Sequence, residues 1–266
     1  MPRRTPVVAL LTDFGTIDHY VGVMKGVLLS ICPAVRIIDL SHQVTPQDVQ
    51  GASYLLWASY AYLPPGTIVL AVVDPGVGTS RKILLVKTRR NVFVAPDNGV
   101  LDLVLWKERP REVLYLREES RFVQKLIAEQ ISTTFHGRDI FAPVGAHLAT
   151  GRRLSSFGTR ARGRSIPQPF IDRRGSNIGP RILHVDRFGN IITNILGLQD
   201  GKGTIVKALA IGNQIVSAWI STYAEAPPET PCLIVGSSGL VEIVMNQKSA
   251  ASFLLSQKPT ELKIVS

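Results

Sequence analysis

The chain has 266 residues, enough to bury a substantial core as one large domain or two smaller ones. Hydrophobic residues make up 45% and charged residues 19% of it, which excludes a disordered chain. Because the net charge of +10 lies on scattered basic pairs and no apolar run approaches the roughly 20 residues that cross a bilayer, we expect neither a nucleic-acid nor a membrane partner.

Short apolar, β-branched runs alternate with helical patterns over about the first 150 residues. Such runs are typical of strands buried on both faces of a sheet. The clearest helical pattern is residues 48–62, where Thr45 can cap, Pro46 takes the first turn and Asp48 lies where a capping-box acid would. The alternation predicts an α/β fold, with a mostly parallel sheet flanked by helices. The runs predicted as strands are residues 7–11, 35–40, 67–73 and 92–95.

The character of the sequence changes after about Gly163. Short apolar stretches separated by turn residues follow, including the hairpin-like pair Gly212-Asn213. They predict a smaller C-terminal antiparallel β domain, in the form of a barrel. The expected division is residues 1–165 for the N-terminal α/β domain, 166–180 for a linker rich in Pro, Gly, Arg and Ser, and 181–266 for the β-barrel domain.

Targeting, redox and metal signals are weak. Residues 7–12 reach Asp13 too soon for the core of a signal peptide, so we expect a cytoplasmic protein. Cys32 and Cys232 are too few for a disulfide framework or a thiolate cluster, and we expect them to be buried as small hydrophobic residues. The five histidines show no paired spacing, which argues against a metal site.

The first motif that could carry chemistry is Thr-Asp-Phe-Gly at residues 12–15, directly after the first strand and followed by Asp18. Open α/β sheets bind ligands at the carboxyl ends of their strands. Asp13 could accept hydrogen bonds from a ribose diol, and Gly15 permits a close turn. The alternative is an aspartate that only caps a helix.

A second carboxylate, Asp74, also ends an apolar run, and Arg81 follows it across a Gly-rich loop. The loop can fold back so that Arg81 approaches Asp74, although it could equally be a plain turn. The third motif, residues 135–139, precedes an apolar helical stretch whose N-terminus offers free N–H groups. There Gly137 would let a ligand approach the backbone, while His136 could also be hydrogen-bonded and inert.

Three further segments offer polar groups. Asn98 belongs to an Asp-Asn-Gly turn. Residues 186–190 supply Asp186, Phe188 and Asn190, which could grip the ammonium group of an amino acid or form a mere polar turn. The Ser-Ser-Gly sequence that begins at Ser237 could offer hydroxyl and N–H donors to a carboxylate.

Five blocks in this order resemble one family, the S-adenosyl-L-methionine hydroxide adenosyltransferases, which are relatives of the fluorinase and chlorinase enzymes. The similarity runs over essentially the whole chain. Each block is weak alone, but five in sequence followed by a β domain are specific. The blocks are Thr-Asp-Phe-Gly at 12–15, Asp-Pro-Gly-Val-Gly at 74–78, Ala-Pro-Asp-Asn-Gly at 95–99, Phe-His-Gly-Arg-Asp at 135–139 and Asp-Arg-Phe-Gly-Asn at 186–190.

The resemblance implies hydrolysis of S-adenosyl-L-methionine to adenosine and L-methionine, without a further cofactor. It also implies a homotrimer with active sites between neighbouring subunits, and a catalytic set that maps onto Asp74, Arg81 and His136. Asp13 matches the ribose-binding aspartate, and Ser237 falls where the methionine carboxylate is bound. The residues expected to bind substrate are Asp13, Asp18, Asn98, Gly137, Asp186, Phe188, Asn190, Tyr223 and Ser237.

Three departures distinguish this chain from the halogenating branch of the family. Fluorinase-like sequences carry a tyrosine where this chain has Asp74, Tyr-Ser where it has His136-Gly137, and a tryptophan where it has Gln47. An ionised Asp74 about 4 Å from a halide would cost about 4 kcal/mol at an effective dielectric near 20. The departures therefore favour the hydrolytic branch.

The expected mechanism is in-line attack by water on the ribose C5′ carbon that bears the sulfonium. Asp74 and His136 would orient and deprotonate the water, while Arg81 holds Asp74 and stabilises hydroxide character. Arg81 is not the base because a guanidinium stays protonated. The sequence leaves open whether Asp74 or His136 takes the proton. The alternatives are a halide-using enzyme of the same fold, and a non-catalytic S-adenosyl-L-methionine-binding protein.

Overall fold

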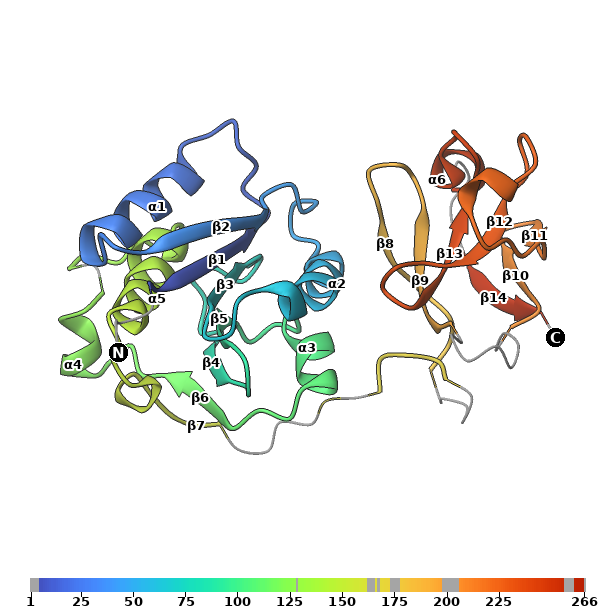
Figure 1. Cartoon of the computed structure of the whole chain (residues 1–266). Coiled ribbons are helices and arrows are strands. Elements are labelled where there is room, and N and C mark those ends of the chain that lie inside the picture. Colours follow the sequence, from blue (N-terminus) through green and yellow to red (C-terminus); the bar gives the residue numbers. More distant parts are fainter. Residues whose placement is uncertain are drawn as a thin grey trace. The chain divides into compact units, whose positions relative to one another are not determined.

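The computed structural model describes residues 5–127, 129–161, 166, 168–172, 178–197, 206–255 and 261–265. The chain divides into two compact units, Met1–Ile166 and Pro167–Ser266 (Figure 1). Much of the predicted linker, including residues 167 and 173–177, lies outside the described residues. Of its described part, Ile171 pairs through its backbone with Asn194 and Leu196 of the second unit.

A mostly parallel sheet forms the centre of the first unit. Its described strands are ordered β2-β1-β3-β5-β4-β6-β7, with β2, β1, β3 and β5 mutually parallel and β4 antiparallel to both of its neighbours. The predicted parallel sheet is thereby confirmed. The strands are β1 (Val7–Thr12), β2 (Arg36–Ser41), β3 (Ile68–Val72), β4 (Ile83–Lys87), β5 (Val92–Pro96), β6 (Glu112–Leu116) and β7 (Gly158–Arg160).

Helices cover both faces of this sheet (Figure 1). Helices α1 and α5 pack together over β1 and β3 on one face, where Leu10, Leu28, Leu70 and Val144 belong to one buried core. Helices α2 and α3 pack together on the other face. The helices are α1 (Tyr20–Ile31), α2 (Val49–Ser59), α3 (Asp102–Lys107), α4 (Arg121–Gln124) and α5 (Ala142–Ala149), with single turns at Tyr60–Tyr62, Gly137–Phe141 and Leu154–Ser156.

The start of α2 differs from the prediction. Asp48, and not Thr45, is the capping residue, since its carboxylate accepts a 2.9 Å hydrogen bond from the N–H of Gly51. The backbone of Gln47 is left-handed, with φ of 67°, so the chain cannot be helical before Asp48. Helix α2 ends at Ser59 and continues as a tighter turn over Tyr60–Tyr62.

The second unit is antiparallel throughout its described strand pairings, as predicted. One sheet has the order β12-β13-β9-β8 and the other β11-β10-β14, and both contribute to one core that includes Ile195, Leu209 and Ile243. Gly212, with φ of 56°, makes the predicted turn between β10 and β11. The elements are β8 (Ile182–Val185), β9 (Ile191–Leu196), β10 (Ala208–Ile211), β11 (Gln214–Val216), β12 (Cys232–Val235), β13 (Leu240–Val244), α6 (Ala250–Leu254) and β14 (Leu262–Val265).

No described helix is long and apolar enough to cross a membrane. Both cysteines, Cys32 and Cys232, are buried and unpaired. Cys32 belongs to the core of the first unit, and Cys232 packs with Ile234 and Val244 in a small apolar cluster of the second. The expectation that they are buried as hydrophobic residues is therefore confirmed.

Candidate active site

Asp74, Arg81 and His136 form one hydrogen-bonded cluster at the carboxyl end of β3. Arg81 donates from Nε to both carboxylate oxygens of Asp74, at 2.9 and 3.1 Å, and from Nη2 to Oδ2 at 2.6 Å. The same Nη2 lies 2.7 Å from Nδ1 of His136. The side chains of Asp74 and Arg81 are only 5% and 10% exposed, so these interactions are shielded from water.

The Gly-rich loop between Asp74 and Arg81 folds back as the sequence suggested. Gly78 has φ of +77°, and a Cβ there would overlap the backbone carbonyl of Thr133. Only glycine therefore fits this turn. The close approach joins the loop to the segment that precedes His136, which accounts for the meeting of two motifs that are distant in the chain.

The cluster determines the tautomer of His136. A guanidinium can only donate hydrogen bonds, so Nδ1 of His136 accepts from Arg81 and the ring proton is on Nε2. Burial and the nearby Arg81 charge lower the pKa of His136 from its ordinary value of 6.5. At neutral pH the ring is therefore uncharged and is a donor at Nε2.

A cavity of about 580 Å³ lies against this cluster in the first unit. Asp74, His136 and Gly137 line it together with Asp13, which follows β1 at the same edge of the sheet. A Cβ on Gly137 would lie 3.1 Å from the sulfur of Met24, so a side chain there would have to displace its neighbours.

An aromatic wall completes this cavity. Phe14, Tyr20 and Phe135 pack edge to face or tilted, with ring centroids 5.1 to 5.9 Å apart. Aromatic rings joined to carboxylates at one edge suit a ligand with flat apolar and hydroxylated parts. The wall was not predicted, although Phe14 and Phe135 belong to two of the motifs.

Two residues of the first unit that were expected to bind substrate, Asp18 and Asn98, do not line this cavity. Asp18 is exposed beyond it. Asn98 donates from Nδ2 to the carbonyl of Val73 at 2.9 Å and accepts from the N–H of Val100 at 3.2 Å. Its side chain therefore fastens the chain immediately before Asp74.

The single π-helical turn Gly137–Phe141 is held by an ion pair. Both nitrogens of Arg138 that face Asp139 donate to its carboxylate, at 2.6 and 2.9 Å, and the N–H of Ser132 donates to it at 2.8 Å. Asp139 is buried, and these donors lower its pKa despite the burial. The hydrogen bond from Ser132 thus ties the preceding loop to the turn that follows His136.

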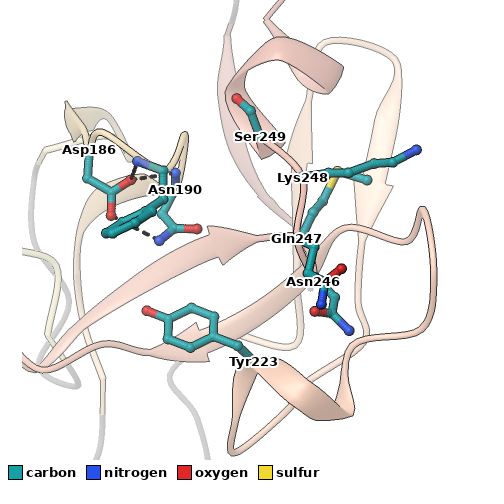
Figure 2. A pocket seen from close by; sticks show the side chains of 9 residues that line it. Asp186, Asn190, Tyr223, Asn246, Gln247, Lys248 and Ser249 are labelled. Carbon is teal, nitrogen blue, oxygen red and sulfur yellow. Dashed lines mark hydrogen bonds between the residues drawn. The ribbon is translucent and has the colours of Figure 1, made fainter.

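A second cavity, of about 590 Å³, lies within the second unit and is lined by Asp186, Phe188, Asn190 and Tyr223. Oδ1 of Asp186 accepts from the backbone N–H groups of Phe188 and Asn190, at 2.9 and 2.8 Å, and Oδ2 accepts from the side chain of Asn190 at 2.9 Å. Figure 2 shows the Tyr223 hydroxyl directed toward the side of the cavity where Asp186 and Asn190 lie.

The other wall of this second cavity was missed by the sequence reading. It is the polar turn after β13, residues 246–249, in which Gln247 has a left-handed backbone with φ of 52° and Ser249 caps α6. Ser237 is exposed and does not line the cavity. Residues held in a left-handed backbone often mark functional sites, and both Gln47 and Gln247 line a cavity.

The chemistry available at the first cavity is activation of a polar nucleophile. A buried carboxylate held by a guanidinium can accept a proton, the guanidinium can stabilise a developing anion, and the imidazole can donate from Nε2. Among the described residues, no group of three or more His, Cys, Asp or Glu is arranged to hold a metal ion.

Comparison with known proteins gives consistent matches. The models of the SAM hydroxide adenosyltransferase N-terminal and C-terminal domains match residues 8–158 and 180–262. The chain is 37% identical over 254 residues to the (R)-S-adenosyl-L-methionine hydrolase of Thermus thermophilus, which covers 93% of this chain and 94% of that protein. It is 30% identical over 226 residues to the fluorinase of an Actinoplanes species, covering 73% and 74%.

The fold has a solved counterpart. The crystal structure of an uncharacterized conserved protein from Thermotoga maritima matches with a TM-score of 0.81 and 34% identity, over 97% of this chain and 100% of that one. Two adjacent domain models of one family match the chain, and a relative is similar to it over nearly its full length, so the family is determined. The chain belongs to the SAM hydroxide adenosyltransferase family.

Proposed function

We propose that this protein hydrolyses S-adenosyl-L-methionine to adenosine and L-methionine. The observation that carries the proposal is the buried cluster of Asp74, Arg81 and His136 beside a cavity that also contains Asp13. The name of the Thermus thermophilus relative, an (R)-S-adenosyl-L-methionine hydrolase, supports the substrate and the reaction.

In the proposed reaction a water oxygen forms a bond to the ribose C5′ carbon as the bond from C5′ to sulfur breaks. The electron pair of that bond goes to sulfur, so the positively charged sulfonium leaves as neutral methionine thioether. The water proton passes to Asp74 and then to solvent. Because the leaving group is already activated, the chemistry needs no further cofactor, and dialysis against a chelator should leave turnover unchanged.

The tautomer of His136 determines which role each residue of the cluster takes in the proposed reaction. Since Nδ1 accepts from Arg81, the ring cannot take the water proton there, and Nε2 already carries a hydrogen. Asp74 is then the base, Arg81 stabilises hydroxide character, and His136 donates a hydrogen bond from Nε2. A positioned base contributes about 10²–10⁴-fold.

The remaining contacts follow from the two cavities. Asp13 would accept hydrogen bonds from the ribose hydroxyls in the first cavity. Asp186, Asn190 and Tyr223 would contact the methionine and adenine parts of the substrate in the second cavity.

We propose a homotrimer in which each active site combines residues of the two cavities from neighbouring subunits. Light scattering gives the subunit number, and mixing Asp74→Ala with Asp186→Ala subunits should restore activity if sites are shared.

The fluorinase relative makes halide use the second candidate function. Asp74 argues against it, because a carboxylate about 4 Å from a halide costs about 4 kcal/mol at an effective dielectric near 20. Incubation with chloride or fluoride should therefore give adenosine and no 5′-halo-5′-deoxyadenosine.

Incubation with S-adenosyl-L-methionine in ¹⁸O-water tests the proposal. Mass spectrometry should find the label in the 5′-hydroxyl of adenosine, and label elsewhere or no adenosine would refute the reaction. Asp74→Ala should abolish turnover while calorimetry still detects substrate binding.

We also propose that the protein acts in the cytoplasm, which is consistent with its two free, buried cysteines. Cell fractionation would test this location.

A further inference from the structure

His42 is a buried histidine that the proposed mechanism does not use. It follows β2 directly, its side chain is only 3% exposed, and it does not line the first cavity. The pairing of β1 with β2 is irregular just before it. Leu10 and Leu11 of β1 pair with Asp39 and Ser41, so one residue of β2 has no counterpart. Such a bulge redirects the side chains that follow it, and His42 meets the end of β1.

The ring of His42 joins the end of β1 to an ion pair. Nδ1 lies 2.8 Å from the hydroxyl of Thr12, the fully buried last residue of β1. Nε2 lies 3.0 Å from Oδ1 of Asp39, whose Oδ2 accepts a 2.6 Å hydrogen bond from Lys25 of α1. In the neutral ring the carboxylate favours the hydrogen on Nε2, so Nδ1 accepts from Thr12.

This tautomer determines how the Thr12 hydroxyl is used. A hydroxyl has a single hydrogen, which here goes to His42, and its lone pairs remain for donors. The backbone N–H of Phe14 donates to that oxygen at 3.3 Å. The backbone carbonyl of His42 also accepts from the N–H of Gly15, at 2.7 Å. His42 therefore holds the chain on both sides of Asp13.

Asp13 is the residue of this segment whose direction matters for a ligand, because its carboxylate lines the first cavity. His42 does not contact that carboxylate and acts on it through the backbone at residues 12–15. Without the ring, the buried hydroxyl of Thr12 loses its acceptor and is no longer oriented toward the N–H of Phe14. A shift of about 1 Å in a binding group is enough to remove most of its effect.

We propose that His42 is the positioning residue for Asp13 and that, through Asp13, it makes binding selective for ligands with ribose hydroxyls. The inference rests on the proposed function, in which Asp13 accepts from the ribose. Its test is a binding measurement and requires no turnover. A ribose brings two hydroxyl donors to the carboxylate, and a 2′,3′-dideoxyribose brings none.

The experiment compares adenosine with 2′,3′-dideoxyadenosine by calorimetry. The wild-type protein should bind adenosine at least about tenfold more tightly, because hydrogen bonds to a charged acceptor are the strong ones. Asp13→Ala should reduce this preference to within about threefold, and His42→Leu should do the same. His42→Asn should retain most of the preference, since its side-chain oxygen can accept from Thr12 near the position of Nδ1.

A double variant separates positioning from a merely structural role. If His42 acts through Asp13, His42→Leu should change the affinity for adenosine by less than about twofold once Asp13→Ala is present. A structural role would weaken binding by the same factor in both backgrounds. His147→Leu alters a half-buried histidine of α5 outside the cavity lining and is the matched control, which should leave the preference unchanged.

An unchanged preference in His42→Leu, or an equal loss of affinity for both nucleosides, would overturn the proposal. If His42→Leu does not fold, Thr12→Val decides, because it removes the hydroxyl between His42 and Phe14 and nearly keeps the shape of the side chain. An unchanged preference there also overturns the proposal, as does a wild-type protein that does not prefer adenosine. Absence of hydrolysis with the preference intact would refute only the proposed function.

Discussion

The backbone N–H of Gln47 donates a 2.8 Å hydrogen bond to Oδ2 of Asp13, a residue that precedes it by 34 positions. The donor is available because the backbone of Gln47 is left-handed, with φ of 67°. The contact joins the loop after β1 to the start of α2, and within the described residues Oδ1 of Asp13 has no hydrogen-bond donor, so it can accept from a ligand. A strained backbone thus orients an acid of the candidate site.

Gln47→Gly should be more stable than Gln47→Val by about 1–2 kcal/mol, because a side chain in the left-handed region is strained and β-branching increases the strain. Thermal or chemical denaturation measures the difference. The same pair of substitutions at Gln214, an exposed position in β11, should give the reverse order because valine suits a strand. Equal stability of the two Gln47 variants would show that the residue carries no backbone strain.

Arg81→Lys should lower kcat by about 10²-fold or more, with substrate affinity within a few-fold. Arg81 makes these contacts from two nitrogens of a planar fork, Nε and Nη2, and a compact ammonium does not reproduce that geometry. Steady-state kinetics measures the effect on kcat, and calorimetry measures the effect on substrate affinity. Arg138→Lys is the matched control, since Asp139 also accepts from the N–H of Ser132, and it should change kcat only slightly. A raised KM with normal kcat for Arg81→Lys would contradict the proposed role.

The activity should fall at acid pH with an apparent pKa below 6.5. The folded pKa of His136 is lowered from that value, so the ring is neutral above it, and protonation would replace the acceptor at Nδ1 with a donor facing Arg81. Since the unfolded chain binds this proton more readily, stability also decreases as pH falls below 6.5. A profile of kcat/KM against pH tests the predicted loss of activity, and denaturation midpoints measured over the same pH range test the predicted loss of stability. An acid limb centred above 6.5 would contradict the assignment.

Gly78→Ala should destabilise the protein by about 1–3 kcal/mol and lower kcat. Its new Cβ would overlap the carbonyl of Thr133, so the loop that carries Arg81 must move. Gly66→Ala separates the two causes, because Gly66 also has a positive φ, of +89°, but nothing within 4 Å of a Cβ. The Gly66 variant should lose stability from backbone strain alone and keep normal kcat. Similar kinetics for the two variants would show that the loop tolerates the shift.

Local pattern predicted β1, β2, β3 and β5, because apolar β-branched runs have few alternatives to a buried sheet, but it did not predict β4, β6 or β7. It also predicted carboxylates at strand ends, where Asp13 and Asp74 lie. The local pattern did not predict the capping residue of α2 correctly. Thr45 is of a residue type that commonly caps helices, and the identity of Gln47 does not indicate its left-handed backbone.

The sequence by itself determined the alternation of elements, the residues at the strand ends and the chemical types available to a site, since these depend on neighbours along the chain. The tertiary structure alone decided that Arg81 donates to Nδ1 of His136, 55 positions away, and so where the ring proton resides. It also decided that Asn98 fastens the backbone at Val73, outside the cavity lining. Hydrogen bonds between distant residues depend on how strands and loops pack, and no local pattern encodes which donor meets which acceptor.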